Sequence, residues 1–150
     1  MRAVIQRVKE ANVEIGNTIV STIGKGLLIL LGIEDSDKSE DVLWLSKKIS
    51  SLRIFNDEND IMNLSVADIE GELLVVSQFT LHAKTKKGNR PSYINAARPE
   101  QAIPLYEEFV LELEKQIRKS VQTGEFGAMM DISLVNFGPV TIVIDTKKKE

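Results

Sequence analysis

The residues best suited to chemistry in this chain are Ser77, Gln78 and Thr80, which follow one another closely around Phe79. They come directly after the apolar run Leu73–Val76, and four consecutive apolar residues are typical of a buried strand. Polar residues after such a run stand where the strand leaves the core. This strand end therefore delivers two hydroxyls, one amide and several backbone N–H groups to a surface, and N–H groups of this kind can stabilise an oxyanion.

A covalent route at this strand end would need a base beside the hydroxyl. His82 is the one histidine of the chain and stands two residues after Thr80, at the start of a polar loop. It could serve Ser77 or Thr80 in a nucleophilic triad. A histidine in a surface loop is more often without a catalytic role, and a threonine without a nearby base is a weak nucleophile. The residues favour a site poor in bases and leave the triad open.

A second candidate is the step Gly138-Pro139, which lies between Asn136 and Thr141. Proline lacks the backbone N–H and fixes its own φ, and glycine takes unusual dihedral angles, so the pair predicts a specialised bend. The cis form of an X-Pro bond costs only about 0.5–1 kcal/mol, and it would turn the two neighbouring carbonyls the same way. Such a pair forms a rigid wall that tests the shape of a small ligand. The alternative is an ordinary turn rich in Gly and Pro.

The elements that must position these segments form a single α+β domain over residues 1–150. We expect a mainly antiparallel, barrel-like sheet with two main helices packed on it. Alternating or continuous apolar residues predict a hairpin, a buried strand and two strands that frame Gly138-Pro139. These strands are 13–15 with 18–21, 27–33, 130–134 and 140–144.

Apolar residues at steps of three and four predict the two helices. The first begins at an N-cap among Asp35–Ser39, and its apolar face is made of Val42, Leu45, Ile49 and Leu52. The second begins near Pro99 and is ended by Gly124. Its apolar face is made of Leu105, Phe109, Leu113, Ile117 and Val121.

Composition argues for metal-free chemistry. The chain has 150 residues, a net charge of −3, no cysteine and one histidine, which excludes disulfides and thiolate chemistry and leaves few metal ligands. We therefore expect no metal and no cofactor. The start of the chain lacks a signal-peptide pattern, and the longest apolar run, Leu27–Leu31, is far shorter than the roughly 20 residues of a membrane span. The expected protein is soluble and cytoplasmic.

Two segments together carry a resemblance to a known family. Ser77–Leu81 and Asn136–Thr141 resemble the paired signature of the D-aminoacyl-tRNA deacylases. Three further stretches, Met1–Val8, Gly88–Tyr93 and Thr123–Met130, are similar to the same family, so the resemblance spans the chain in order. Phe137 departs from the acidic residue that is more usual there.

The resemblance implies a hydrolase that cleaves the ester bond of D-aminoacyl-tRNA and works as a homodimer. In such an enzyme the free 2′-hydroxyl of the terminal adenosine helps to activate water. Phe79 and its neighbour would offer backbone N–H groups to the oxyanion, while Ser77 and Gln78 orient the acyl end and the adenosine. Gly138-Pro139 would reach the neighbouring chain's pocket. Met130 and Asn136 complete the substrate-binding residues that the resemblance implies.

Selectivity for the D form over the L form would follow from a backbone wall at Gly138-Pro139. Once the ester and the amino group are held, the α-carbon has one direction for hydrogen and one for the side chain. A backbone placed against one direction rejects the L form, which protects correctly charged tRNA. Glycine has hydrogen in both directions, so we expect glycyl-tRNA, including glycine mischarged on tRNA(Ala), to be a further substrate.

Basic residues after the strand end predict contacts with the tRNA acceptor end. A chain with net charge −3 needs local cations to bind RNA, and four of them stand in one loop: Lys84, Lys86, Lys87 and Arg90. The tail Lys147–Lys149 is a weaker second candidate. Two other classes stay open, namely a small-molecule esterase that uses Ser77 or Thr80 with His82, and a noncatalytic tRNA-binding module.

Overall fold

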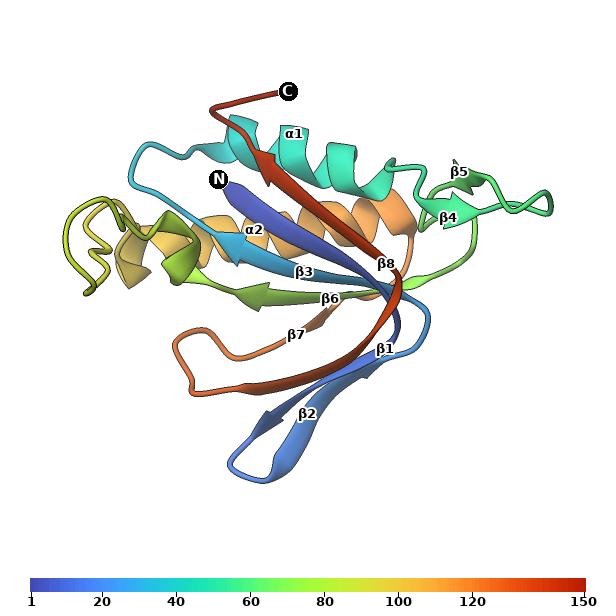
Figure 1. Cartoon of the computed structure of the whole chain (residues 1–150), viewed down its shortest axis with the longest axis horizontal. Helices are drawn as coiled ribbons and strands as arrows, with labels where there is room; N and C mark the ends of the chain where they lie inside the picture. The colour runs from blue at the N-terminus through green and yellow to red at the C-terminus, as the bar shows by residue number, and fades with distance from the viewer.

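The computed structural model describes residues 1–150 as a curled sheet with two helices on one face (Figure 1). The main strands are β1 (Arg2–Ile15), β2 (Thr18–Ile23), β3 (Gly26–Gly32), β6 (Glu72–Ser77), β7 (Gln122–Thr123) and β8 (Asp131–Asp145). The helices are α1 (Ser39–Ser50) and α2 (Pro99–Ile117), with a short 3-10 helix η1 (Phe79–His82) after β6. A small separate pair is formed by β4 (Phe55–Asn56) and β5 (Met62–Leu64). Neither long helix is apolar enough to cross a membrane.

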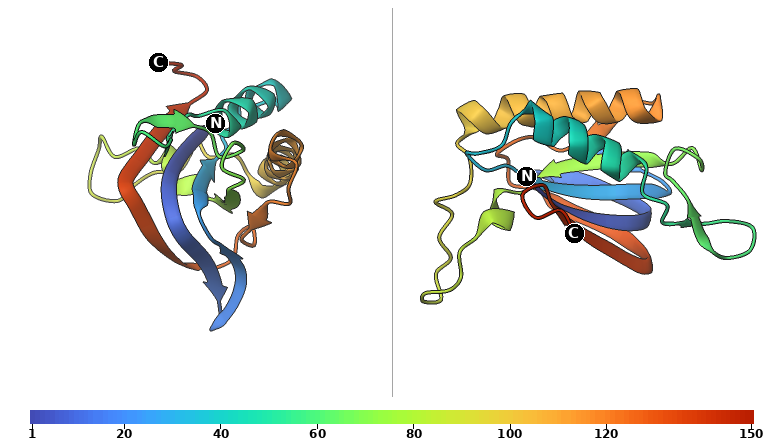
Figure 2. Two further views of the ribbon diagram at one scale, coloured as in Figure 1. Left: turned by 90° about the vertical axis from the view of Figure 1, so that its right-hand side faces the viewer. Right: turned by 90° about the horizontal axis from the view of Figure 1, so that it is seen from above.

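Strand β1 organises the sheet. Its first half pairs with β3 and its second half with β2, while β8 runs antiparallel beside both halves. The remaining pairs, β3 with β6 and β6 with β7, are parallel. Figure 2 shows that the long strands bend strongly and that both helices cover the same face. The prediction of a mainly antiparallel, barrel-like sheet with two helices is confirmed.

Strands β3 and β6 are apolar on both faces because each face of the sheet carries its own core. The larger cluster lies between the sheet and the helices, and the smaller one lies on the opposite face inside the curl. Along β6, for example, Leu73 and Val75 face the helices while Leu74 and Val76 face the curl. This explains why the sequence shows continuous apolar runs there instead of alternation.

Helix α2 is shorter than the sequence predicts. It ends at Ile117, where Arg118 takes a left-handed conformation with φ of 53°, and not at Gly124. Val121 continues the four-residue spacing and is buried, but it belongs to the segment beyond the helix. Leu52 likewise packs on the core from beyond the end of α1. Val121 is buried and Leu52 partly buried without being helical, which periodicity alone does not distinguish.

The prediction of two strands framing Gly138-Pro139 is wrong. One strand, β8, runs through the step without interruption, and the Gly138-Pro139 peptide bond is cis. The pairing skips here, since Gln6 pairs with Thr141 and Val8 with Asn136. No ladder bond is lost at the proline because the irregularity leaves this segment outside the regular pairing.

The two ends of the chain meet at the loop before α1 (Figure 1). The amino group of Met1 donates to the buried carboxylate of Asp37, which also lies 3.4 Å from Lys147 Nζ. Lys147 Nζ donates to Asp41 at 2.9 Å. Burial would raise the pKa of Asp41, but hydrogen bonds led by that of Lys147 outweigh it and lower the pKa to about 2. The loop is thereby tied to both ends of the sheet.

Candidate active site

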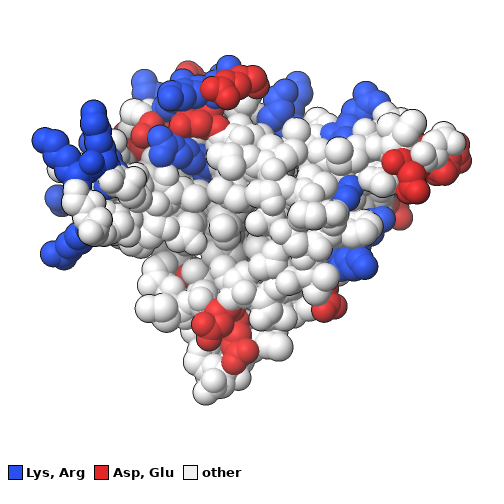
Figure 3. All heavy atoms as spheres, viewed as in Figure 1, with Lys and Arg blue, Asp and Glu red and all other residues white.

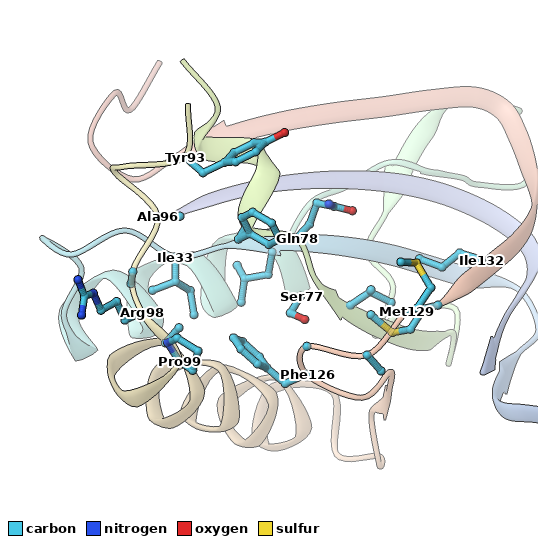
Figure 4. Close-up of a pocket in the computed structure, with 18 residues that line it drawn as sticks. Ile33, Ser77, Gln78, Tyr93, Ala96, Arg98, Pro99, Phe126, Met129 and Ile132 are labelled. Carbon is cyan, nitrogen blue, oxygen red and sulfur yellow. The ribbon is translucent and has the colours of Figure 1, made fainter. Parts of the chain in front are cut away.

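A cavity of about 750 Å³ opens at the carboxyl ends of β3 and β6. Figure 4 shows the side chains of Ser77 and Phe126 close together inside it, with Tyr93 at its edge and Pro99 at the start of α2. The lining is mostly apolar, and among its residues Arg98 is the only one with a permanent charge. The cavity therefore offers hydrogen-bonding groups on one wall and apolar surface on the others.

The polar wall is fixed by contacts with β3 and α2. Gln78 N–H donates to Leu31 O at 2.7 Å, which extends the parallel pairing of β6 by one residue. The turn then folds over Gly32, where a Cβ would stand 2.9 Å from Gln78 O. From below, Tyr106 donates to Val75 O at 2.8 Å, and burial raises the pKa of Tyr106, so it stays a donor.

The structure brings together most of the residues predicted for catalysis. Ser77, Gln78 and Phe79 line the cavity, and so does Met130. Thr80 does not line it, but its hydroxyl accepts a hydrogen bond of 2.5 Å from Gln78 Nε2. Thr80 thus holds the amide of Gln78, a contact that depends on the turn of η1.

The position predicted for His82 is wrong. His82 is only 3% exposed and lies at the end of η1, whereas the sequence placed it in a surface loop. Nδ1 lies 3.6 Å from the carboxylate of Glu34, and Nε2 has no partner. His82 forms no hydrogen bond with Ser77 or Thr80, so the geometry gives neither hydroxyl a base.

Gly138 and Pro139 do not line the cavity of their own chain, and neither does Asn136. The strand register places Ser77 level with Ile144, with two strands between them. Pro139 lies five residues further along β8, which is about 17 Å of extended strand. The two halves of the predicted site therefore lie apart within one chain, and both Gly138 and Pro139 are exposed.

Arg7 holds the Gly138-Pro139 segment in place. This side chain is buried, and Nε donates to Phe137 O at 2.8 Å while Nη1 donates to Ile54 O at 2.7 Å. The guanidinium also stacks on the ring of Phe137, 4.7 Å from its centroid. A Cβ at Gly138, whose φ is 130°, would stand 2.8 Å from Arg7 Nη2. One arginine thus fixes the backbone of this segment from beneath.

The basic loop is exposed and lies beside the cavity. Backbone hydrogen bonds between Lys84 and Ser92, of 2.8 and 3.1 Å, close its base. Figure 3 shows a group of basic side chains at the end of the molecule that carries this loop. Two lysines of the tail are engaged differently, since Lys147 pairs with Asp41 and Lys149 lies over the ring of Trp44. The loop is the better placed of the two basic segments.

Several residues of the site carried no predicted role. Tyr93, Phe126 and Met129 line the cavity, and Arg7 supports the Gly138-Pro139 segment. All four stand in the stretches that carry the family resemblance, which is the only signal in the sequence that marks them. Arg98 lies outside those stretches and could not have been found in this way.

The curled sheet, the two covering helices and the pocket at the strand ends define a small α+β protein with a candidate site at the carboxyl ends of β3 and β6. Residues 4–145 match the family model described as D-Tyr-tRNA(Tyr) deacylase. The chain belongs to that family.

Relatives agree over the full length. Proteins named D-aminoacyl-tRNA deacylase from Flavobacterium psychrophilum and Akkermansia muciniphila are 65% and 58% identical, each covering 100% of both chains. A solved structure titled as a c-Myc DNA unwinding element binding protein superposes with a TM-score of 0.92 at 41% identity, over 97% of this chain and 98% of that one. A probable eukaryotic D-amino acid tRNA deacylase shares the fold, with a TM-score of 0.82 at 17% identity over 95% and 97%.

Proposed function

We propose that this enzyme hydrolyses the ester bond of D-aminoacyl-tRNA and releases free tRNA and a D-amino acid. The observation that carries the proposal is a pocket with hydrogen-bonding groups at Ser77, Gln78 and Phe79 and without a base. Such a pocket suits a substrate that brings its own catalytic hydroxyl. Family membership and the names of the full-length relatives support the same substrate.

In the proposed mechanism the protein positions the ester and stabilises the oxyanion. The 2′-hydroxyl of the terminal adenosine assists the attacking water. Backbone N–H groups of Phe79 and Thr80 donate to the developing oxyanion, and donors fixed in advance lower the barrier without reorganising. Ser77 and Gln78 orient the acyl end and the adenosine, and Thr80 keeps the Gln78 amide in place. Met130 lines the same cavity and contacts the substrate from its apolar side.

Selectivity is assigned to Gly138-Pro139 of a second copy of the chain. Within one chain this segment is exposed and remote from the cavity, so it can reach a pocket only across an interface. The enzyme is therefore a homodimer in which each pocket is completed by its neighbour. The Gly138-Pro139 backbone occupies the space into which the side chain of an L-aminoacyl group would point, and it therefore rejects L-aminoacyl groups. Asn136 supports the segment through its hydrogen bond of 3.0 Å to Gln6.

Glycyl-tRNA is a further substrate in this account. Glycine presents hydrogen in both directions, so a backbone wall cannot exclude it. Glycine mischarged on tRNA(Ala) would then be cleared by the same site.

The acceptor end of tRNA is bound through its phosphates by the basic loop. The loop follows η1 closely in the sequence, and its four basic side chains are exposed: Lys84, Lys86, Lys87 and Arg90. Neutralised phosphates release counterions, so binding weakens as salt rises. The enzyme works where aminoacyl-tRNA is used, in the cytoplasm.

The decisive experiment compares D- and L-tyrosyl-tRNA as substrates of the pure protein. We expect rapid loss of the D ester, slow or no loss of the L ester, and intermediate loss of glycyl-tRNA. Hydrolysis of neither tRNA, with retained tRNA binding, would indicate a binding module. Hydrolysis of simple aryl esters that is lost in His82→Ala would indicate an esterase, which the burial of His82 against Glu34 disfavours.

A further inference from the structure

Two aromatic side chains form an exposed pair at the rim of the cavity. The rings of Phe79 and Tyr93 meet edge to face, with centroids 5.1 Å apart and an angle of 76° between their planes. Both residues expose much of their surface to solvent: Phe79 is 55% exposed and Tyr93 is 37% exposed. Neither ring belongs to a core cluster. Packing within the chain therefore does not account for the pair.

The pair stands between the cavity and the basic loop. Phe79 comes shortly before the loop and Tyr93 shortly after it, and the backbone pairing of Lys84 with Ser92 brings the two together. Both aromatic residues also line the cavity. A single-stranded RNA that runs from the cavity to the basic loop can therefore contact these rings.

We propose that Phe79 and Tyr93 form a stacking platform for the unpaired nucleobase that precedes the terminal adenosine of the tRNA. The proposal rests on the proposed function and extends it by one nucleotide. Aromatic rings beside a basic groove are the usual means of holding single-stranded RNA, because every base has a π-face and every nucleotide a phosphate. The acyl group and the adenosine occupy the cavity, so the next base meets the rim.

The test compares two substrates that share the acylated adenosine and differ in whether further nucleotides are attached to it. D-tyrosyl-adenosine carries no base that could reach the platform, whereas D-tyrosyl-tRNA does. In Tyr93→Ala we expect kcat/KM for D-tyrosyl-tRNA to fall about tenfold further than that for D-tyrosyl-adenosine, from the loss of one stacked base. Tyr93→Phe keeps the ring and should restore the rate on tRNA. Ile94→Ala, which trims an exposed apolar neighbour without a ring, is the matched control.

Binding of an unacylated single-stranded RNA ending in CCA gives a second readout. Tyr93→Ala should weaken it about tenfold without changing its salt dependence, because stacking moves no charge. Equal losses on both substrates would show that the adenosine itself stacks there, and no loss on tRNA would remove the platform. If the Tyr93→Ala protein fell from dimer to monomer mass in light scattering, the rings would be covered by a second copy of the chain. Each of these results overturns the proposal, whereas wild-type protein inactive on both substrates would overturn the proposed function instead.

Discussion

The turn after β6 and the Gly138-Pro139 segment of β8 are built in opposite ways. The turn is held by several elements of its own chain, through Leu31, Gly32 and Tyr106, and it faces the cavity at the strand ends. Gly138-Pro139 is exposed on a strand at the edge of the sheet and depends mainly on one arginine beneath it. The first region has hydrogen-bonding groups beside a cavity, and the second has an exposed backbone and no cavity.

This difference suggests that the turn supplies the hydrogen-bonding groups for hydrolysis, whereas Gly138-Pro139 completes the neighbouring pocket and sets its selectivity. A region that must stabilise a transition state benefits from donors fixed in advance by the core. A region that excludes one enantiomer needs only a hard surface presented to another chain. Changes in the two regions should therefore have separable effects.

The largest effect is expected from Arg7→Ala. Removal of the buried guanidinium leaves Phe137 O and Ile54 O without their donors and should lower the free energy of unfolding by about 3 kcal/mol. Deacylation of D-tyrosyl-tRNA should fall strongly, while binding of unacylated CCA-ended RNA by the folded protein persists. Urea unfolding and the two assays check this, with Arg7→Lys as the control that keeps the charge but not the fork of donors. Unchanged stability and rate in Arg7→Ala would remove the distinction between the regions.

Gly32→Ala tests the other region. Its Cβ would meet Gln78 O at 2.9 Å and Leu81 Cβ at 3.0 Å, so the turn must shift, at a cost of about 1–3 kcal/mol. Both the deacylation rate and the binding of CCA-ended RNA should fall together, because the turn carries the donors and lines the cavity. If Gly32→Ala lost the deacylation rate but kept RNA binding, as we expect for Arg7→Ala, the proposed role of the turn would be contradicted.

The sequence predicted the turn better than it predicted β8. The apolar run of β6 and the polar residues after it are local features, and the structure confirms that strand and its exit at Ser77. The continuity of β8 depends on the irregular pairing opposite Gly138-Pro139, which no local pattern reveals. The burial of Arg7 and of His82 is likewise set by tertiary contacts. A charged or titratable side chain in a polar stretch looks exposed until its partners are known.

Smaller effects are expected from the two side chains of the alternative triad. Thr80→Ala loses one hydrogen bond to Gln78, so the rate should fall about fivefold. His82→Ala should lose less than about tenfold, whereas removal of a true general base costs about 10²–10⁴-fold. Single-turnover rates on D-tyrosyl-tRNA distinguish these cases. A loss of about a thousandfold or more in both variants, as expected for removal of a base and its nucleophile, would restore the triad.

The smallest effect is expected where Lys147, near the end of the chain, pairs with Asp41 of α1, away from both regions. The pKa of Asp41 is about 2 in the folded protein, below the ordinary value of 3.8. The stability from this group is therefore complete above about pH 4 and is lost as the pH falls toward 2. Lys147→Ala should lower the free energy of unfolding at pH 7 by about 1 kcal/mol, with a smaller difference at about pH 2.5, and should leave the deacylation rate unchanged. A difference that grows on acidification would refute this.

The most direct test of the shared site is a mixed dimer of two inactive variants. Gln78→Ala damages the pocket, and Gly138→Ala forces a Cβ against Arg7 at a φ that L residues rarely adopt. If Gly138-Pro139 completes the neighbouring pocket, each mixed dimer has one intact site, and an equal mixture refolded together should regain about a quarter of wild-type activity on D-tyrosyl-tRNA. Mixed dimers that form, as mass spectrometry would show, yet remain inactive would place both halves of the site in one chain and contradict the account.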